Sequence, residues 1–272
     1  MRKDTILITG RSAAGKTTII RQLNKFIDEF AILRYQTALS DSQTIMERVV
    51  KDDQQGGFHH THPWIKPSDK ARHTHDSPEK PTVPFTLTDN AIANLMMRDF
   101  FKVLALLPHD DGIKFAEWAG GVNTNDIYEP AARVDLSYST ITSLLRQDKL
   151  PSFGLERVVA VIHVQTADEL RFKLNGRRSP PTEEEVTAGT ASFPLEAAAM
   201  NIFGTDDFSE LAEPFLRNEI GIPFIFELTN DGTETFERDI RNVARQLFFS
   251  SGIEYRSTTL TELHPPRSRE RI

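Results

Sequence analysis

The chain has 272 residues, of which 39% are hydrophobic, so it is long enough for one large or two small domains with a buried core. Its 32 basic and 39 acidic side chains give a net charge of -7, which argues against binding nucleic acid by overall charge but leaves room for a local basic groove. The chain contains no cysteine, which excludes disulfides, thiolate zinc sites and cysteine nucleophiles. It has no long apolar run and no export signal, so we expect a cytoplasmic protein, or one of the host cytoplasm if it is viral, without a membrane partner.

Strands and helices alternate in the first part of the chain. Residues 5–9 predict a short buried strand, and the apolar spacing of residues 16–27 predicts a helix directly after the loop that follows this strand. A second strand is expected at residues 30–38, followed by a helix from about Ser40. Periodicity is lost in residues 51–86, which are rich in His, Pro, Asp and Lys and predict a long insertion.

The same alternation continues to the end of the chain. We expect helices at residues 88–107, 136–147, 167–175, 182–189, 194–203, 208–219 and 233–249, and strands at residues 112–118, 156–164 and 222–228. This order predicts an α/β three-layer sandwich with a mainly parallel five-stranded sheet and helices on both faces. Residues 1–252 would form this domain, and the polar residues 253–272 a loose tail.

Residues 10–17 match the pattern G-x-x-x-x-G-K-[ST] between a predicted strand and a predicted helix, which is the context that a phosphate-binding loop requires. Backbone N–H groups can surround a phosphate here because Gly10 and Gly15 permit a tight curl. Lys16 is expected to bridge the β- and γ-phosphates, and the Thr17 hydroxyl to ligate Mg²⁺. With ATP and Mg²⁺ as cofactors, the expected nucleotide-binding residues are Gly10, Arg11, Ser12, Ala13, Ala14, Gly15, Lys16, Thr17 and Thr18.

The segment "VVAVIHVQTADELRFKLNGRR" combines a strand, a small polar pair and a helix with spaced arginines. It resembles the lid of P-loop nucleoside and nucleotide kinases of the thymidylate-kinase-like type. The resemblance implies a lid at residues 166–192 in which Arg171 and Arg178 stabilise the migrating γ-phosphoryl group. Helical spacing places these two arginines on one face with Asn175, although a solvated basic helix would look the same.

The segment "PFIFELTNDGTETF" resembles the last strand of the same kinases, whose following loop lies beside the adenine. By this resemblance Asn230 would contact the nucleotide. The sequence contains no N-K-x-D segment, which disfavours a guanine-specific switch protein.

Glu117, at the end of the third predicted strand, is the first candidate on the acceptor side. It could accept the proton of an acceptor hydroxyl or hold Mg²⁺ through water. The resembled kinases carry an arginine just after this position, whereas residues 118–121 here are Trp-Ala-Gly-Gly. Asp41 is the alternative base or a helix-start acid, and Asn123 and Asn125 suit either a substrate loop or an ordinary turn.

The insertion contains two further sets of candidate residues. A zinc site formed by imidazoles and carboxylates is one reading, but the spacing fits no established zinc finger, and the length of the insertion favours a cover over the acceptor. The histidines concerned are His59, His60, His62, His73 and His75. Phe58 and Trp64 would stack on a base or anchor the insertion to the core.

These patterns predict a kinase that transfers the γ-phosphate of ATP to a hydroxyl or phosphate of a nucleoside-like small molecule. A kinase acting on nucleic acid is an alternative, similar to the phage enzymes that phosphorylate 5-hydroxymethylpyrimidines in DNA. From another class, the chain could be a nucleotide-dependent regulatory or chaperone ATPase that binds a protein partner.

Overall fold

A computed structural model describes most of the predicted domain. The described residues are 3–29, 35–40, 65–66, 86–87, 97–98, 100–102, 104–107, 112–124, 135–178, 200–201 and 203–250. The predicted helix after Ser40, the predicted helix at residues 182–189 and the tail at residues 253–272 lie outside the described residues.

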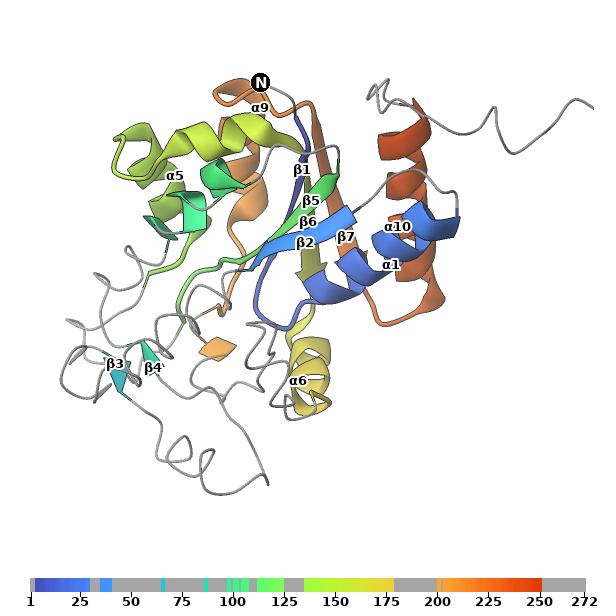
Figure 1. Cartoon of the computed structure of the whole chain (residues 1–272). Helices are drawn as coiled ribbons and strands as arrows, with labels where there is room; N and C mark the ends of the chain where they lie inside the picture. The colour runs from blue at the N-terminus through green and yellow to red at the C-terminus, as the bar shows by residue number, and fades with distance from the viewer. Residues whose placement is uncertain are drawn as a thin grey trace, which may run out of the picture.

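Five parallel strands form the central sheet in the order β2-β5-β1-β6-β7 (Figure 1). They are β1 (Thr5–Gly10), β2 (Tyr35–Ser40), β5 (Ile113–Ala119), β6 (Val158–Thr166) and β7 (Phe224–Asn230). The predicted α/β architecture with a five-stranded parallel sheet is therefore confirmed.

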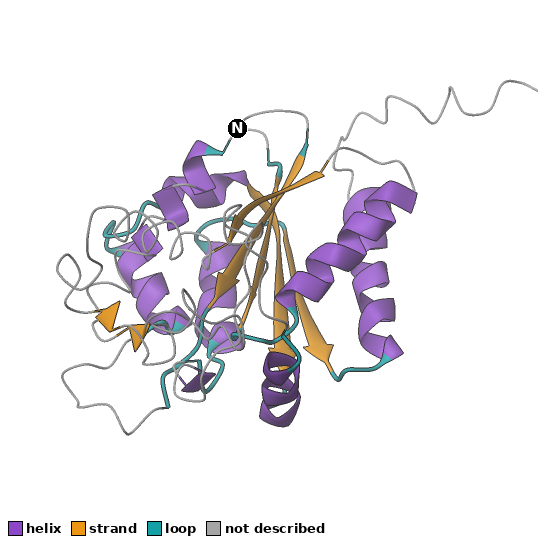
Figure 2. Ribbon diagram, turned by 60° about the horizontal axis from the view of Figure 1, so that its bottom comes forward, coloured by secondary structure: helices purple, strands orange, loops and turns teal. Residues whose placement is uncertain are grey.

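Helices cover both faces of this sheet (Figure 2). On one face lie α1 (Lys16–Glu29) and α10 (Glu234–Arg245). On the other lie α5 (Tyr138–Arg146), α9 (Glu213–Asn218) and the described part of the helix predicted at residues 88–107. The three layers follow from the sequence because the strands β1, β5 and β6 are buried on both faces and so need helices on each side.

Shorter elements connect these layers. The helix α6 (Asp168–Gly176) follows β6 directly and lies beyond the carboxyl ends of the strands (Figure 1). A 3₁₀ turn, η3 (Ser152–Arg157), leads into β6, and π-helical turns are formed at η4 (Phe208–Ala212) and η5 (Gln246–Ser250).

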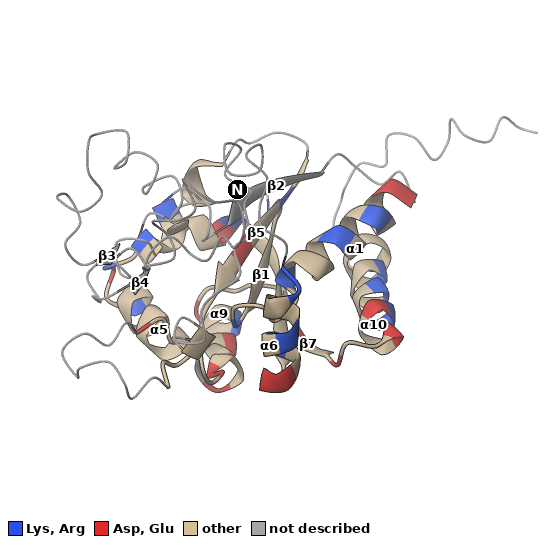
Figure 3. Cartoon of the chain, turned by 90° about the horizontal axis from the view of Figure 1, so that it is seen from below, with Lys and Arg blue, Asp and Glu red and all other residues tan. Residues whose placement is uncertain are grey.

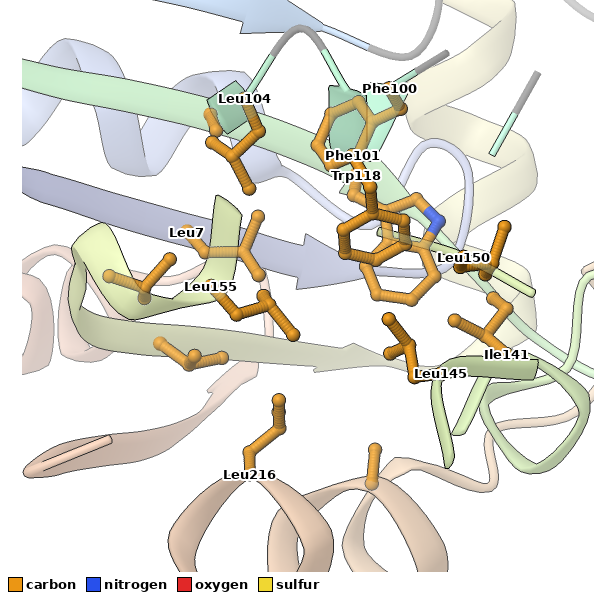
Figure 4. Close-up of a cluster of buried hydrophobic side chains, with 14 of the residues drawn as sticks. Leu7, Phe100, Phe101, Leu104, Trp118, Ile141, Leu145, Leu150, Leu155 and Leu216 are labelled. Carbon is orange, nitrogen blue, oxygen red and sulfur yellow. The ribbon is translucent and has the colours of Figure 1, made fainter. Parts of the chain in front are cut away.

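Each face of the sheet has its own hydrophobic core. We call the cluster around Leu7, Trp118 and Leu145 the α5-side core; Figure 4 shows these side chains converging between the sheet and its covering helices. The cluster around Ile8 and Ile240 is the α1-side core. Successive residues of a strand point to opposite faces, so β1 contributes to both cores.

Two details of the strands differ from the prediction. Strand β2 was expected at residues 30–38 but is described at Tyr35–Ser40, because its pairing with β5 continues until Ser40 lies opposite Glu117. A separate antiparallel pair, β3 (Ile65–Lys66) and β4 (Thr86–Leu87), was not predicted. Such two-residue strands are too short to show a period.

A buried ion pair fastens the amino-terminal end of the sheet. The Arg157 guanidinium donates to the Asp4 carboxylate at 2.7 Å, and both side chains are almost fully buried. Arg157 also donates to the Leu107 carbonyl oxygen, so the pair joins the residue before β1, the end of η3 and the bend at Leu107. Within the described residues, no helix has both the length and the apolar character needed to cross a membrane.

Candidate functional site

The loop between β1 and α1 lies at the carboxyl end of the central strand. The chain runs from β1 to β2 on one side of the sheet and from β6 to β7 on the other. Open α/β sheets bind ligands at such a switch point, outside the carboxyl ends of their strands. The loop therefore lies where sheets of this kind bind ligands, and its phosphate-binding role stays a prediction.

The loop is tightly curled, as the glycine positions predicted. Gly10, Ala13 and Gly15 have φ angles of 145°, 61° and 104°. A Cβ atom on Gly10 would lie 2.6 Å from the Val164 carbonyl oxygen, so β6 passes too close for any side chain. Glycine is thus required at this position by both the backbone conformation and the neighbouring strand.

Lys16 is the first residue of α1, and its side chain is 5% exposed. Its ammonium group donates to the carbonyl oxygens of Gly10 and Arg11, each at 3.1 Å. The positive charge is therefore held against the phosphate loop itself, at the amino-terminal end of a helix.

The structure brings together Thr17 and Glu117, which the sequence analysis treats as separate candidates for the magnesium and acceptor sites. The Thr17 hydroxyl donates to Glu117 Oε2 at 3.3 Å. Glu117 is half-buried near the end of β5, opposite Ile8 of β1 and Ser40 of β2. Hydroxyl and carboxylate oxygens are ligands that Mg²⁺ accepts, with water and phosphate oxygens completing its shell. The described part of the chain holds no group of three or more acidic or histidine side chains that could bind a metal ion.

Side chains from outside the loop bind its carbonyl oxygens. Arg171 Nε donates to the Ser12 oxygen at 3.0 Å. The Thr166 hydroxyl and Asn230 Nδ2 both donate to the Ala14 oxygen at 2.8 Å. The structure therefore places Arg171 and Asn230 at the loop, as part of its support. Both side chains donate to backbone oxygens of the loop, and their predicted roles toward the γ-phosphoryl group and the adenine stay predictions.

The Arg11 side chain extends from the phosphate loop to the start of α6. Its guanidinium donates to Asp168 Oδ1 at 2.7 Å and to the carbonyl oxygens of Thr166 and Gly204. Arg171 Nη1 donates to the same Asp168 oxygen, also at 2.7 Å. Partial burial alone would raise the pKa of Asp168, but the two arginines outweigh it and hold that pKa below its usual value.

The inward face of α6 is polar, which is the reverse of an ordinary amphipathic helix. Arg171 and Asn175 are buried, whereas Phe172 is 43% exposed. Arg178, just beyond the helix, is half-buried, and its backbone N–H donates to the Asn175 oxygen. Seen from below, α6 carries acidic side chains at its start and basic ones further along (Figure 3). Arg171 and Asn175 share the buried face of α6 as predicted, whereas Arg178, predicted on the same helical face, lies beyond the end of the helix. Arg171 turns this face toward the phosphate loop.

The glycines after β5 are closely packed. A Cβ atom on Gly120 would lie 2.7 Å from the ring of Tyr138, and one on Gly121 would lie 2.9 Å from the Thr205 carbonyl oxygen. Two isolated bridges also hold this segment, pairing Gly121 with Leu136 and Val122 with Thr205. This packing favours the interpretation of an ordered turn over that of a flexible substrate loop.

A row of hydrogen-bonded side chains next to the phosphate loop was not predicted from the sequence. His163 in β6 is fully buried, with Nδ1 2.9 Å from the Thr9 hydroxyl and Nε2 2.9 Å from Asp206 Oδ2. Its ring stacks on Phe208 with a centroid distance of 4.0 Å. Burial, reinforced by the charge of Asp206, raises the pKa of the neighbouring Tyr138 hydroxyl, which stays protonated at neutral pH. The only signal in the sequence was a histidine inside an otherwise apolar strand.

Some predicted site residues lie outside the described residues. These are Asp41, Phe58, His59, His60, His62, Trp64, His73, His75, Asn125 and lid residues 179–192. Asn123 is described and half-buried, shortly after the end of β5.

No protein-family model matches the sequence, and a search of curated proteins gives no match either. Among solved structures, the chain is similar to a shikimate kinase from Acinetobacter baumannii in complex with shikimate, with 14% identity and a TM-score of 0.38 over 92% of this chain and 94% of that one. It is also similar to TT1252 from Thermus thermophilus, with 16% identity and a TM-score of 0.38 over 91% and 99% of the two chains. At these values neither likeness carries an argument about activity, and the thymidylate-kinase-like resemblance stays a prediction.

Proposed function

We propose that the chain is an ATP-dependent phosphotransferase of the P-loop class that uses Mg²⁺. One observation carries this proposal: the Thr17 hydroxyl, next to Lys16 on the phosphate loop, lies 3.3 Å from the carboxylate of Glu117 on the neighbouring strand. The motif is contiguous in sequence, but this pairing spans a hundred residues and exists only in the fold. It joins the two kinds of oxygen ligand that a magnesium-dependent nucleotide site needs.

The loop supplies the donor half of the reaction. Its N–H groups and the amino-terminal end of α1 would bind the phosphates of ATP. The Lys16 ammonium, now on the Gly10 and Arg11 oxygens, would exchange these partners for phosphate oxygens. Bound Mg²⁺ would neutralise charge on the β- and γ-phosphates, and Thr17 and Glu117 are the residues that fit it.

The acceptor half is proposed on the carboxyl side of β5. Glu117 is half-buried there and can orient or deprotonate an acceptor hydroxyl. The absence of an arginine in residues 118–121 argues against the standard acceptor contact of the kinases that the chain resembles. We propose a nucleoside-like acceptor that is held without this arginine; the alternative, which the missing arginine would suit, is a hydroxymethylated pyrimidine in DNA.

The test is transfer of label from γ-labelled ATP in the presence of Mg²⁺. Separate pools would contain nucleosides, nucleotides, DNA with 5-hydroxymethylpyrimidines, and RNA. We expect label in one pool, and its loss in Lys16→Ala, because the variant lacks the charge that holds the phosphates. Lys149→Ala is the matched control, since Lys149 is exposed and lies outside the site.

Two outcomes would contradict the proposal in different ways. Hydrolysis of ATP without a labelled acceptor in any pool would exclude the kinase and favour a regulatory or chaperone ATPase. Failure of the protein to bind ATP or ADP would exclude the nucleotide site itself.

A further inference from the structure

The carbonyl oxygens on the outside of the phosphate loop determine where its N–H groups point. In a planar trans peptide unit, the C=O and the next residue's N–H point in opposite directions. Holding the Ser12 oxygen from outside therefore turns the Ala13 N–H inward, and holding the Ala14 oxygen turns the Gly15 N–H inward. Ala13 and Gly15 belong to the stretch whose N–H groups are expected to bind phosphate.

Arg171 holds the Ser12 carbonyl oxygen, and each of its three side-chain nitrogens donates a hydrogen bond. Its Nε donates to the Ser12 oxygen at 3.0 Å, its Nη1 to Asp168 at 2.7 Å, and its Nη2 to the Met200 oxygen at 3.3 Å. The side chain is 1% exposed. A guanidinium that is so deeply buried and makes three separate contacts is suited to fixing a backbone, since any movement toward a phosphate would break them.

Asp168 is the counter-ion that allows two arginines to meet at the loop. Arg11 and Arg171 both contact its Oδ1 at 2.7 Å. Two positive charges on one carboxylate oxygen repel each other, and burial together with the charge of Arg11 lowers the pKa of Arg171. The Asp168 carboxylate offsets that repulsion and thereby keeps both side chains in place.

We propose that Arg171, with Asp168 as its counter-ion, is a positioning residue that presets the phosphate loop for binding a nucleotide diphosphate. Its contribution is made in the ground state, before any phosphoryl transfer. The inference rests on the phosphate-binding part of the proposed function and is independent of the acceptor and of the transfer step.

The test compares binding with turnover in Arg171→Ala. ADP affinity with Mg²⁺ would be measured by calorimetry, and kcat and KM for ATP by initial rates. Loss of a charged hydrogen bond that presets the loop should weaken ADP binding about 10- to 100-fold and raise the KM for ATP in step, with a smaller change in kcat. Arg171→Lys should recover only part of the affinity, because one ammonium cannot span the three acceptors. Unchanged ADP affinity with a large fall in kcat would instead show a transition-state role and overturn the proposal.

Asp168→Asn gives a second test, in which electrostatics alone and the positioning role predict opposite changes in ADP affinity. Removing a negative charge beside a phosphate site should strengthen anion binding if charge alone matters. The positioning role predicts weaker ADP binding, because the two arginines lose their shared counter-ion. Asp168 is 55% exposed, so this variant should fold even if Arg171→Ala does not. Tighter or unchanged ADP binding would contradict the inference.

Arg217→Ala is the matched control for both variants. Arg217 is an exposed arginine that pairs with Glu213 at 2.7 Å within one helix, away from the loop. The ADP affinity of the Arg217→Ala variant should equal that of the wild type. If the wild type itself does not bind ADP, the proposed function fails; if the wild type binds and the Arg171 and Asp168 variants bind equally well, only the present inference fails.

Discussion

At the scale of single residues, Glu117 lies where two chemical roles meet. Its carboxylate accepts a hydrogen bond from Thr17, the expected magnesium ligand, and it also stands at the end of β5, where an acceptor hydroxyl is proposed. A metal-binding carboxylate and a general base respond differently to pH and to the Mg²⁺ concentration. Kinetics of one variant can therefore separate the two roles.

Glu117→Gln keeps the shape of the side chain and removes its charge. The contact with Thr17 favours the metal role, so we expect kcat/KM to fall about 100-fold and the half-saturating Mg²⁺ concentration to rise about 10-fold. Initial rates across a Mg²⁺ titration, repeated at several pH values, measure both quantities. Thr17→Val should raise the Mg²⁺ requirement in the same direction. A lost acidic limb of the pH–rate profile with an unchanged Mg²⁺ requirement would assign Glu117 as the base.

The phosphate loop could be recognised from the sequence because its residues are contiguous and each contributes backbone groups. The contacts of Arg171 and Asn230 could not be predicted in the same way. Their acceptors in the loop are 159 and 216 residues away in the chain, and spacing within a helix or strand carries no information about such pairs. The helical face of Arg171 was predictable, but its acceptor depends on how α6 packs against the loop.

At the scale of elements, α5 shows how distant residues complete a helix that local sequence predicts. The first N–H groups of a helix lack partners inside it. Ser137 is the N-cap, and its hydroxyl accepts from the Thr140 N–H at 3.2 Å. The Asp207 carboxylate accepts from the Tyr138 and Ser139 N–H groups at 3.0 and 2.9 Å. The start of α5 is therefore tied to the segment before η4.

Substitutions at this helix start should lower the free energy of unfolding by graded amounts. Ser137→Ala removes one acceptor and should cost about 1 kcal/mol. Asp207→Ala removes a charged acceptor of two N–H groups and should cost more, about 2 kcal/mol. Denaturant unfolding measures both values. Ser143→Ala, at an exposed position inside α5, is the control and should change stability by less than about 0.5 kcal/mol. An unchanged free energy of unfolding in Asp207→Ala would show that Asp207 adds nothing beyond the local cap.

The existence of the strands was predictable because buried parallel strands are nearly continuous apolar runs, as in Val158–Thr166. Their ends were less predictable. Strand β2 ends where its pairing with β5 ends, and the sequence of β2 alone does not contain that information. The same holds for the pairing of β3 with β4, which joins two segments without a periodic pattern.

At the scale of the whole molecule, alternation of strands and helices predicted the layers but did not predict the order of the strands. Strand β5 lies between β1 and β2, although both precede it in the chain. This order puts Glu117 beside the phosphate loop. The acceptor side of the site is therefore a product of topology, which explains why its geometry could not be read from any single motif.

The central position of β1 also links the two cores. Leu7 belongs to the α5-side core, while Ile6 and Ile8 belong to the α1-side core. Because β1 packs against both cores, destabilising one core also destabilises the other. We therefore expect the described domain to unfold as one cooperative unit.

Truncation of one residue in each core tests this expectation. Ile240→Ala in the α1-side core and Leu145→Ala in the α5-side core should each cost about 2–5 kcal/mol, because both side chains are buried and leave cavities. In a Trp64→Phe background, Trp118 is the single tryptophan and reports on the α5-side core. If β1 couples the two layers, Ile240→Ala must lower the midpoint of the Trp118 fluorescence transition and that of far-UV circular dichroism equally. The contrary outcome is a Trp118 transition that stays at the parental midpoint while the circular dichroism midpoint falls. It would show that the two layers unfold separately. The phosphate loop would then be coupled more strongly to α1 than to β5, the strand that carries Glu117.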